Sequence, residues 1–227
     1  MHTLAIDSSA RACSCAILKD GKLLGEGFID VGLTHSRTLM PLVESILKSA
    51  DMALSDVDRF AVSVGPGSFT GVRIGVSAIK GMAFALDKPC VGVSTLLAMA
   101  YQPLRLYEGP VCPVMDARVR QAYAALFDLE CGTVTRLWED GAVGLDDLRA
   151  RLPAGTLLVG DGAHLLYDPD GPFKMAPPHL VAQRAVGVAL AAADMPDMAA
   201  DALVPIYLRR PQAEREYQEK QRKEDAT

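Results

Sequence analysis

The start of the chain alternates hydrophobic and polar positions in the manner of short strands. His2–Ile6 is an apolar run that ends at Asp7-Ser8-Ser9, and Ala10–Leu18 alternates small and apolar residues. The dipeptide Asp20-Gly21 is a strong hairpin signal, after which Lys22–Asp30 returns along the preceding strand. This pattern predicts a strand, a polar turn and a hairpin.

From Thr34 the hydrophobic positions change to the spacing of a helix that ends near Ala50. One apolar stripe follows the positions i, i+3, i+4, i+7, i+8 and i+11. It consists of Leu39, Leu42, Val43, Ile46, Leu47 and Ala50. Pro41 lies inside this pattern, and its missing N–H would break a helical hydrogen bond unless it lies near the first turn. We therefore expect the regular helix to begin close to Thr38.

A second strand and helix follow. Phe60–Val64 predicts a strand, and the glycine segment Gly65–Gly71 connects it to a helix that extends to about Leu86. The helix has a small-residue stripe beside an aliphatic one: Gly71, Gly75, Ala78 and Ala85, and Val72, Val76, Ile79, Ala83 and Leu86. Since a glycine inside a helix costs about 1 kcal/mol relative to alanine, the glycines indicate a close approach to another element.

The second half of the chain repeats the opening pattern. A strand at Val111–Met115 ends at Asp116 and leads into a hairpin through Leu129. Alanine-rich helices are expected near residues 183–193 and 197–203. Because the two halves share the order strand, Asp, hairpin but negligible sequence identity, the repeat is one of pattern.

Composition is that of a soluble globular protein with a sizeable core. Half of the 227 residues are hydrophobic, 22% are charged and the net charge is −5. This charge leaves no basic field for phosphates, so strong unaided binding of nucleic acid is not expected. An RNA substrate would have to be held mainly by another subunit.

Neither the cysteines nor the N-terminus indicates export or a metal site. The five cysteines are scattered without a CxxC or Cys/His cluster, which favours buried, reduced thiols. The N-terminus has no basic segment before a long apolar run, and no stretch reaches the ~20 apolar residues of a membrane span. We therefore expect a cytoplasmic protein that does not bind a membrane.

Two polar positions could belong to a nucleotide site. Asp7, Ser8 and Ser9 end the first strand, where a carboxylate can hold Mg²⁺ through water and hydroxyls can contact phosphate. Asp116 ends the corresponding strand of the second half. Taken alone, each position is better explained as a polar turn between two strands.

The glycine segment lies between a strand and a helix, where phosphate-binding loops occur. No Gly-Lys-Ser/Thr sequence follows it, and its spacing misses the dinucleotide fingerprint. A tight turn that needs glycine backbones is therefore favoured over an anion site. No Ser-His-Asp, Cys-His or metal-ligating set can be argued from spacing, so a peptidase is not supported.

Four segments together resemble the bacterial TsaB (YeaZ) family. They are the glycine signature within Asp58–Gly75, and the segments His35–Pro41, Met115–Arg118 and Val204–Arg209. The resemblance spans about residues 2–210 and implies an α/β fold of the actin-like ATPase (ribonuclease H-like) type with two related subdomains. It divides the chain into an N-terminal subdomain (1–104), a C-terminal subdomain (105–208) and a charged tail (209–227), which we expect to be solvated.

Proteins of this family are non-catalytic relatives of TsaD, the enzyme that transfers threonylcarbamoyl to the adenosine next to the anticodon of certain tRNAs. In TsaD, the strand after the glycine-loop helix leads into two metal-binding histidines four residues apart. Thr95 and Met99 stand at those positions here, and a thioether is a poor ligand for a hard metal. The resemblance therefore implies a chain with no catalytic residues and no metal.

The resemblance also implies a scaffold or activator subunit of the tRNA threonylcarbamoyladenosine modification complex. Its partners would be a TsaD homologue and the ATPase TsaE, with tRNA reached only through the complex and a homodimer as an option for the chain alone. No cofactor is expected, apart from weakly held ATP or ADP with Mg²⁺ at the complex interface.

The family's partner surface lies on the two helices of the first subdomain. Transferred to this sequence, it would consist of Leu39, Leu42, Val43, Ile46, Val72, Arg73, Val76 and Phe84. Without the resemblance, we would favour a helix pair whose stripes pack wholly within the domain. The alternative function is an active ATPase or sugar-kinase-like enzyme that uses Asp7, Asp116 and the Asp161-Gly162 turn around a nucleotide.

Overall fold

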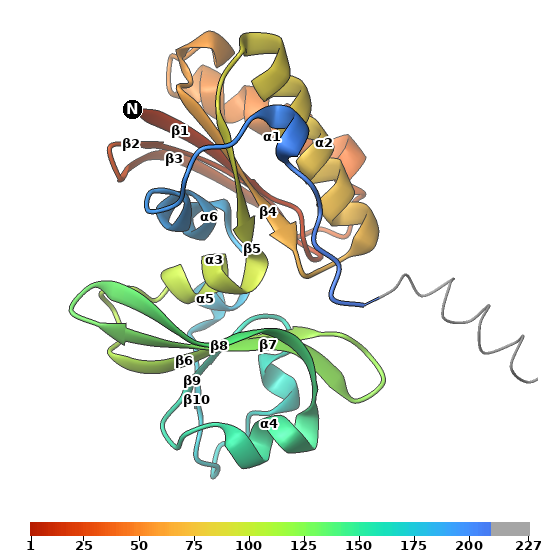
Figure 1. Ribbon diagram of the computed structural model, residues 1–227, viewed down its shortest axis with the longest axis vertical. Coiled ribbons are helices and arrows are strands. Elements are labelled where there is room, and N and C mark those ends of the chain that lie inside the picture. Colours follow the sequence, from red (N-terminus) through yellow and green to blue (C-terminus); the bar gives the residue numbers. More distant parts are fainter. Residues whose placement is uncertain (210–227) are drawn as a thin grey trace, which may run out of the picture.

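The computed structural model describes residues 1–209, which form two lobes that are each built on a five-stranded sheet (Figure 1). The expected charged tail lies, apart from Arg209, outside the described residues. Both lobes are layered α/β units with helices on the faces of their sheets, and the two sheets face each other across a central layer of short helices.

The first sheet has the strand order β3-β2-β1-β4-β5. Its strands are β1 (His2–Asp7), β2 (Cys13–Lys19), β3 (Lys22–Ile29), β4 (Arg59–Gly65) and β5 (Cys90–Ser94). The first three form an antiparallel meander, and β4 and β5 continue the sheet in parallel to β1. Asp20 and Gly21 have φ values of 49° and 78°, as the predicted two-residue hairpin turn requires.

The second sheet has the order β10-β9-β6-β7-β8. Its strands are β6 (Gly109–Asp116), β7 (Gln121–Glu130), β8 (Thr133–Gly144), β9 (Leu157–Val159) and β10 (Lys174–Met175). An antiparallel meander, β6 to β8, is again extended in parallel by two strands, β9 and β10. The predicted repeat is therefore confirmed, and Asp7 and Asp116 end equivalent strands.

Within residues 1–209, six helices and three 3₁₀ turns surround these sheets. They are α1 (His35–Ser49), α2 (Phe69–Leu86), α3 (Thr95–Tyr101), α4 (Leu145–Arg151), α5 (Pro178–Val181), α6 (Ala185–Ala192), η1 (Leu54–Asp56), η2 (Ala163–Leu165) and η3 (Ala200–Ala202). Helices α1 and α2 cover one face of the first sheet and α6 the other, while α4 packs on the outer side of the second sheet. Helix α3 contributes to the cores of both lobes.

Two helix predictions were wrong. Helix α1 begins at His35 rather than near Thr38, because Pro41 faces solvent, where water can replace the donor that proline lacks. The helix expected near 197–203 is only the turn η3, because Met198 pairs in extended form with Cys90 of β5.

The C-terminal part of the described chain returns to the first lobe. Helix α6 packs against β1, β2 and β4, and the amide of Ile206 donates to the carbonyl of Val64 at 2.7 Å. The predicted C-terminal subdomain 105–208 is therefore too long, because residues 185–208 complete the first lobe. The expected boundary near residue 104 remains a proposal.

Helix α2 is long and apolar enough to cross a membrane by length and composition alone. One side of it is buried against β1, β4 and β5 in the described structure. Its apolar character is thus explained by its position as a core helix of the first lobe.

Candidate functional site: the interlobe cleft and the face of helices α1 and α2

The turn after β1 is buried beneath the glycine segment. Asp7, Ser8 and Ser9 are 1%, 1% and 0% exposed. The amide of Ser68 donates to the carbonyl of Ser9 at 2.6 Å, and the Ser8 hydroxyl donates to the carbonyl of Gly71 at 2.9 Å. These hydrogen bonds hold the start of α2 directly on the turn.

The glycines of this segment are explained by that contact. A Cβ atom at Gly67 or Gly71 would lie closer than 3.0 Å to the carbonyl oxygen of Ser9 or Ser8, respectively, and one at Gly75 would meet the Ser8 hydroxyl. The close approach predicted from the small-residue stripe is therefore confirmed, and its target is the turn at residues 7–9. The Ser68 side chain also accepts from the Gly71 amide at 3.2 Å and caps α2, so the loop serves as a tight strand-to-helix turn.

The Asp7 carboxyl is enclosed within the turn. Its Oδ1 accepts hydrogen bonds from the amide and hydroxyl of Ser9 at 2.9 and 2.7 Å. Its Oδ2 is buried and faces the Ser63 hydroxyl, which lowers the pKa of Asp7 although neither atom completes a well-formed hydrogen bond. Burial, partly offset by these hydrogen bonds, raises the pKa of Asp7 above its usual value of 3.8. The charged form is therefore disfavoured at this position.

This arrangement predicts that Asp7→Asn stabilises the protein at pH 7, by about 1–2 kcal/mol. The raised pKa means that ionisation of Asp7 lowers the stability of the folded state; this cost is absent below pH 3.8, grows up to the folded pKa and is constant above it. An amide can keep the Ser9 contacts without ionising. Urea unfolding between about pH 4 and pH 7 should show the variant's advantage shrinking as the pH falls.

Asp116→Asn is the matched control for this prediction, because Asp116 ends the equivalent strand but is exposed. We expect its unfolding free energy to stay within about 0.5 kcal/mol of the wild type at both pH values. A destabilised Asp7→Asn protein at pH 7 would show that the ionised carboxylate is favoured where it lies.

A cleft of about 490 Å³ separates the lobes at the ends of β1 and β6. Its lining includes Ser9, Asp116 and Asp161 but neither Asp7 nor Ser8. Asp116 Oδ1 accepts from the amide of Arg118 at 2.7 Å, which fixes the hairpin loop beside it. The structure thus brings two second-lobe carboxylates together and separates them from Asp7.

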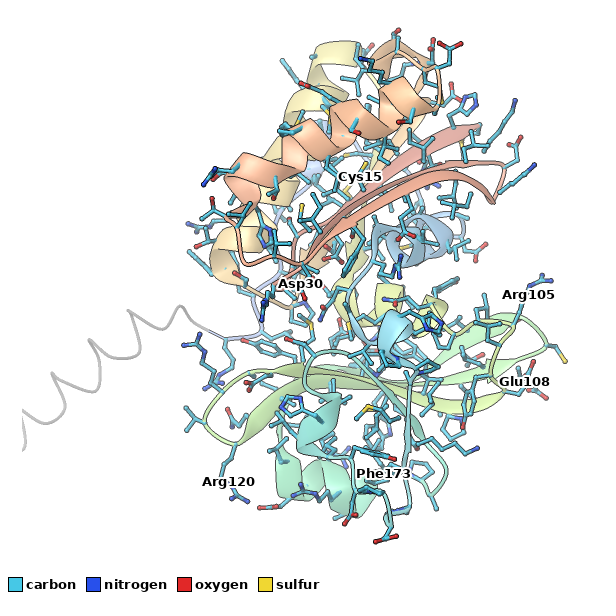
Figure 2. All side chains as sticks on the ribbon, turned by 180° about the vertical axis from the view of Figure 1, so that it is seen from behind. Cys15, Asp30, Arg105, Glu108, Arg120 and Phe173 are labelled. Atoms are coloured by element: carbon cyan, nitrogen blue, oxygen red, sulfur yellow. The ribbon has the colours of Figure 1, made fainter. Side chains whose placement is uncertain are left out.

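The charged lining of the cleft combines these two carboxylates with the side chains of Arg11, Arg118 and Arg209. Asp161 Oδ1 accepts from the Gln183 side-chain amide at 3.1 Å. Desolvation and, more weakly, the neighbouring Asp116 raise the pKa of Asp161. In Figure 2, Asp30 marks the cleft-facing end of the first lobe, and Arg120 lies at the outer tip of the second-lobe hairpin. The volume suits a small polar ligand, and both lobes supply hydrogen-bonding side chains to the lining.

Thr95 is the first residue of α3 and Met99 lies one turn further along, and both are fully buried. The end of the Met99 side chain packs on Gly160 of the second lobe, where a Cβ atom would collide with it. These two positions are therefore filled by core side chains between the lobes. Within residues 1–209, no group of three or more His, Cys, Asp or Glu side chains could hold a metal ion.

The structure corrects the list of partner-facing residues on α1 and α2. Leu39, Val43, Val72 and Val76 are between 1% and 3% exposed and belong to the core of the first lobe, so they cannot reach a partner. Leu42 and Ile46 are partly buried and pack on the glycines of β3. Both helices bury their aliphatic stripes on one sheet, which leaves Arg73 and Phe84 as the exposed members of the predicted set.

Sequence reasoning missed the surroundings of Arg73. Its guanidinium lies 3.8 Å from the ring centroid of Phe69 and 5.7 Å from that of Tyr207, and its Nε donates to the Tyr207 hydroxyl at 2.8 Å. The two rings are 4.7 Å apart. Both aromatic residues lie in segments that carried the family resemblance, and this was the only sign in the sequence that they matter. Phe69 and Tyr207 are far apart in the sequence, so their contact with each other and with Arg73 could not be predicted.

Comparison with protein-family models matches residues 30–157, more than half of the chain, to "TsaD: tRNA N6-adenosine threonylcarbamoyltransferase". The chain is 37% identical to the tRNA threonylcarbamoyladenosine biosynthesis protein TsaB of Bacillus subtilis (strain 168) over 147 residues, which is 65% of this chain and 64% of that protein. The alignments span between 51% and 64% of the length of the first curated relatives.

Solved structures extend the similarity over nearly the whole described chain. YeaZ from Pseudomonas aeruginosa superposes with a TM-score of 0.78 at 29% identity, covering 91% of this chain and 99% of that one. Component A of the (R)-2-hydroxyglutaryl-CoA dehydratase of Acidaminococcus fermentans has a TM-score of 0.51 at 15% identity, covering 84% and 96%, and supports the fold alone. The predicted two-subdomain actin-like ATPase fold is confirmed.

Proposed function

Because the chain belongs to the TsaB (YeaZ) family, we propose that it acts in tRNA threonylcarbamoyladenosine biosynthesis as a non-catalytic subunit that binds a TsaD homologue. The binding surface is the exposed side of the α1–α2 pair, here called the helix-pair face: Arg37, Met40, Glu44, Arg73, Ile74, Ser77 and Phe84. The same proposal includes the expected scaffold role and the ATPase TsaE as a further partner. It also includes contact with tRNA only through the complex and a cytoplasmic setting.

The observation that carries this proposal is the exposure of Phe84. Its side chain is 82% exposed, whereas the other large apolar side chains of α2 are buried or half-buried. Met40 on α1 is also 39% exposed. Burying such a phenylalanine would gain about 1.5–3 kcal/mol, which makes it a suitable anchor for a partner.

Two features of the structure support the absence of catalysis in this proposal. Core side chains fill the positions that the resemblance aligns with metal-binding histidines, Thr95 and Met99. Asp7 is enclosed by the Ser9 turn, apart from the cleft carboxylates. The cleft could still hold ATP or ADP with Mg²⁺ weakly when the complex forms, as the resemblance implies.

Phe84→Glu is the test of the binding surface. We expect this change to raise the dissociation constant for the purified TsaD homologue at least about 30-fold, because a charge replaces an aromatic side chain that the partner would bury. Titration calorimetry with the two full-length proteins measures the effect. The control is Leu137→Glu, which makes the same kind of change at a 51% exposed position on β8 of the second lobe and should alter binding less than about threefold.

Two results would contradict the proposal. Equal affinities for the two variants would place the interface elsewhere on the chain. Steady ATP hydrolysis by the purified chain, lost in Asp116→Asn, would favour the enzyme alternative.

A further inference from the structure

The last described residues, 204–209, run from the first lobe to the level of the second and are here called the strap (Figure 1). They belong to none of the helices and strands of the described chain. The amide of Ile206 donates to the carbonyl of Val64 in β4, and Arg209 Nη1 donates to the carbonyl of Ala117 in the second lobe at 2.6 Å. The strap therefore joins the two lobes directly.

The first lobe has a shaped seat for the strap. Gly65, the last residue of β4, has a φ of 116°, and an added Cβ atom would lie 2.4 Å from the carbonyl oxygen of Ile206. A glycine is therefore needed for the strap to approach the end of β4 this closely. The ring of Tyr207 lies 4.7 Å from that of Phe69, and its hydroxyl accepts from Arg73 Nε at 2.8 Å.

The seat in the second lobe is the hairpin loop between β6 and β7. Its residues 118–120 have φ values between 54° and 62°, a left-handed conformation that a β-branched residue such as Val119 rarely adopts. Such a conformation persists only where the surrounding contacts hold it. The hydrogen bond from Arg209 to the Ala117 carbonyl is one of the contacts that fix this loop beside the cleft.

The strap also forms one edge of the interlobe cleft, because residues 206–209 belong to its lining. On the solvent side, Val204, Ile206 and Tyr207 are 59%, 51% and 41% exposed. A half-exposed segment outside the helices and strands is of the kind that opens locally while the rest of a protein stays folded. The strap can therefore leave its seats without disrupting either core.

We propose that the strap is a lid of the interlobe cleft. While Tyr207 and Arg209 are seated, the strap covers the floor of the cleft, and a ligand reaches that floor only after both side chains are released. The floor includes Met115 of β6, which lines the cleft but is only 3% exposed. This inference concerns the chain alone and does not depend on the proposed function.

The test measures how fast a cysteine in the cleft floor reacts with N-ethylmaleimide, a small uncharged reagent. Met115→Cys supplies this thiol, in a chain that also carries Cys131→Ser because Cys131 is the exposed native cysteine. Cys112 is buried in the core on the other side of β6, so its labelling reports unfolding of the second lobe. Site-resolved mass spectrometry follows both thiols in the same sample.

Arg209→Ala should raise the labelling rate at position 115 about tenfold, since labelling tracks the population of the open strap. The matched control is Arg120→Ala, which removes an arginine that pairs with Asp146 at the outer tip of the same hairpin (Figure 2). This control should stay within about twofold of the parent protein. Loss of a nearby positive charge would by itself slow a thiol, because the thiolate is the reacting form.

Two further measurements address the strap itself. Tyr207→Phe keeps the ring beside Phe69 but removes the hydroxyl that accepts from Arg73, and should raise labelling at position 115 about threefold. In hydrogen exchange, the amide of Ile206 should exchange about tenfold faster in Arg209→Ala, because opening breaks its hydrogen bond to Val64.

The outcomes decide for or against a lid. Faster labelling confined to position 115, together with faster exchange at Ile206, supports it. Equal labelling rates in Arg209→Ala and Arg120→Ala would overturn it. A parallel rise at Cys112 would also overturn it, because release of the strap would then unfold the second lobe rather than open the cleft.

Discussion

Replacing Gly71 with alanine is expected to lower the free energy of unfolding by about 3 kcal/mol. The added Cβ would overlap the carbonyl oxygen of Ser8, a backbone atom that cannot rotate away. Relief requires α2 to move off the turn at residues 7–9, which would break the hydrogen bond from the Ser8 hydroxyl to the Gly71 carbonyl. Urea unfolding followed by circular dichroism at pH 7 measures the loss.

Gly81→Ala is the matched control, because Gly81 lies in the same helix with no atom within 4 Å of an added Cβ. There the better helix propensity of alanine should raise the unfolding free energy by up to about 1 kcal/mol. Similar effects for the two substitutions would mean that the contact with Ser8 does not constrain α2.

The second large effect is expected at Arg59, where Arg59→Met should lower the free energy of unfolding by about 3 kcal/mol. This side chain is 4% exposed and donates to the carbonyls of Ala192 and Met195 at 2.7 and 2.5 Å, at the end of α6. Its Nε lies 2.5 Å from the carboxylate of Asp197. Because Asp197 is 53% exposed, most of the loss should come from the two buried carbonyls rather than from the ion pair.

Arg59→Lys separates the two contributions. Lysine keeps the positive charge but cannot reach both carbonyls with a planar fork, so we expect an intermediate loss of about 1–2 kcal/mol. Lys22→Met, an exposed change of the same kind, should stay within about 0.5 kcal/mol of the wild type. If Arg59→Met unfolds at the wild-type urea concentration, Arg59 does not join β4 to the returning segment 192–197 in solution.

Helix α2 links these stability effects to the proposed function. Its buried side is fixed by Ser8 through Gly71, and its exposed side carries Arg73 and Phe84. A displaced α2 would move Arg73 and Phe84 out of place on the helix-pair face. We therefore expect Gly71→Ala to weaken binding of the TsaD homologue even under conditions where the variant remains folded, whereas Gly81→Ala should spare it.

Much of the architecture could be read from local pattern. Strand periodicity and the Asp20-Gly21 turn predicted the first hairpin, and the repeat of that pattern at Asp116 predicted the second sheet. Helical spacing predicted α1 and α2, because an amphipathic period depends on neighbours a few residues apart. The glycines within α2, which lower helix stability, correctly predicted a close approach to another element but not which element it is.

The candidate site was less predictable. The aliphatic stripe of α1 and α2 has the same spacing whether it faces a sheet or a partner, and only the packed structure showed that Leu39, Val43, Val72 and Val76 are core residues. Likewise, Asp7 and Asp116 look equivalent in sequence. One is enclosed by the Ser9 turn and the other is open to the cleft, because the glycine segment covers only the first.

The sequence by itself determined most of the strands, the hairpins, the two main helices and the family to which the chain belongs, but not the short strand β10. Only the tertiary structure decided that residues 185–208 complete the first lobe, that Tyr207 holds Arg73, and that Arg59 caps α6. The physical reason is that periodicity and turn chemistry are properties of adjacent residues. Contacts such as Arg73–Tyr207 join positions far apart in the chain, and they form only once the sheets have brought them together.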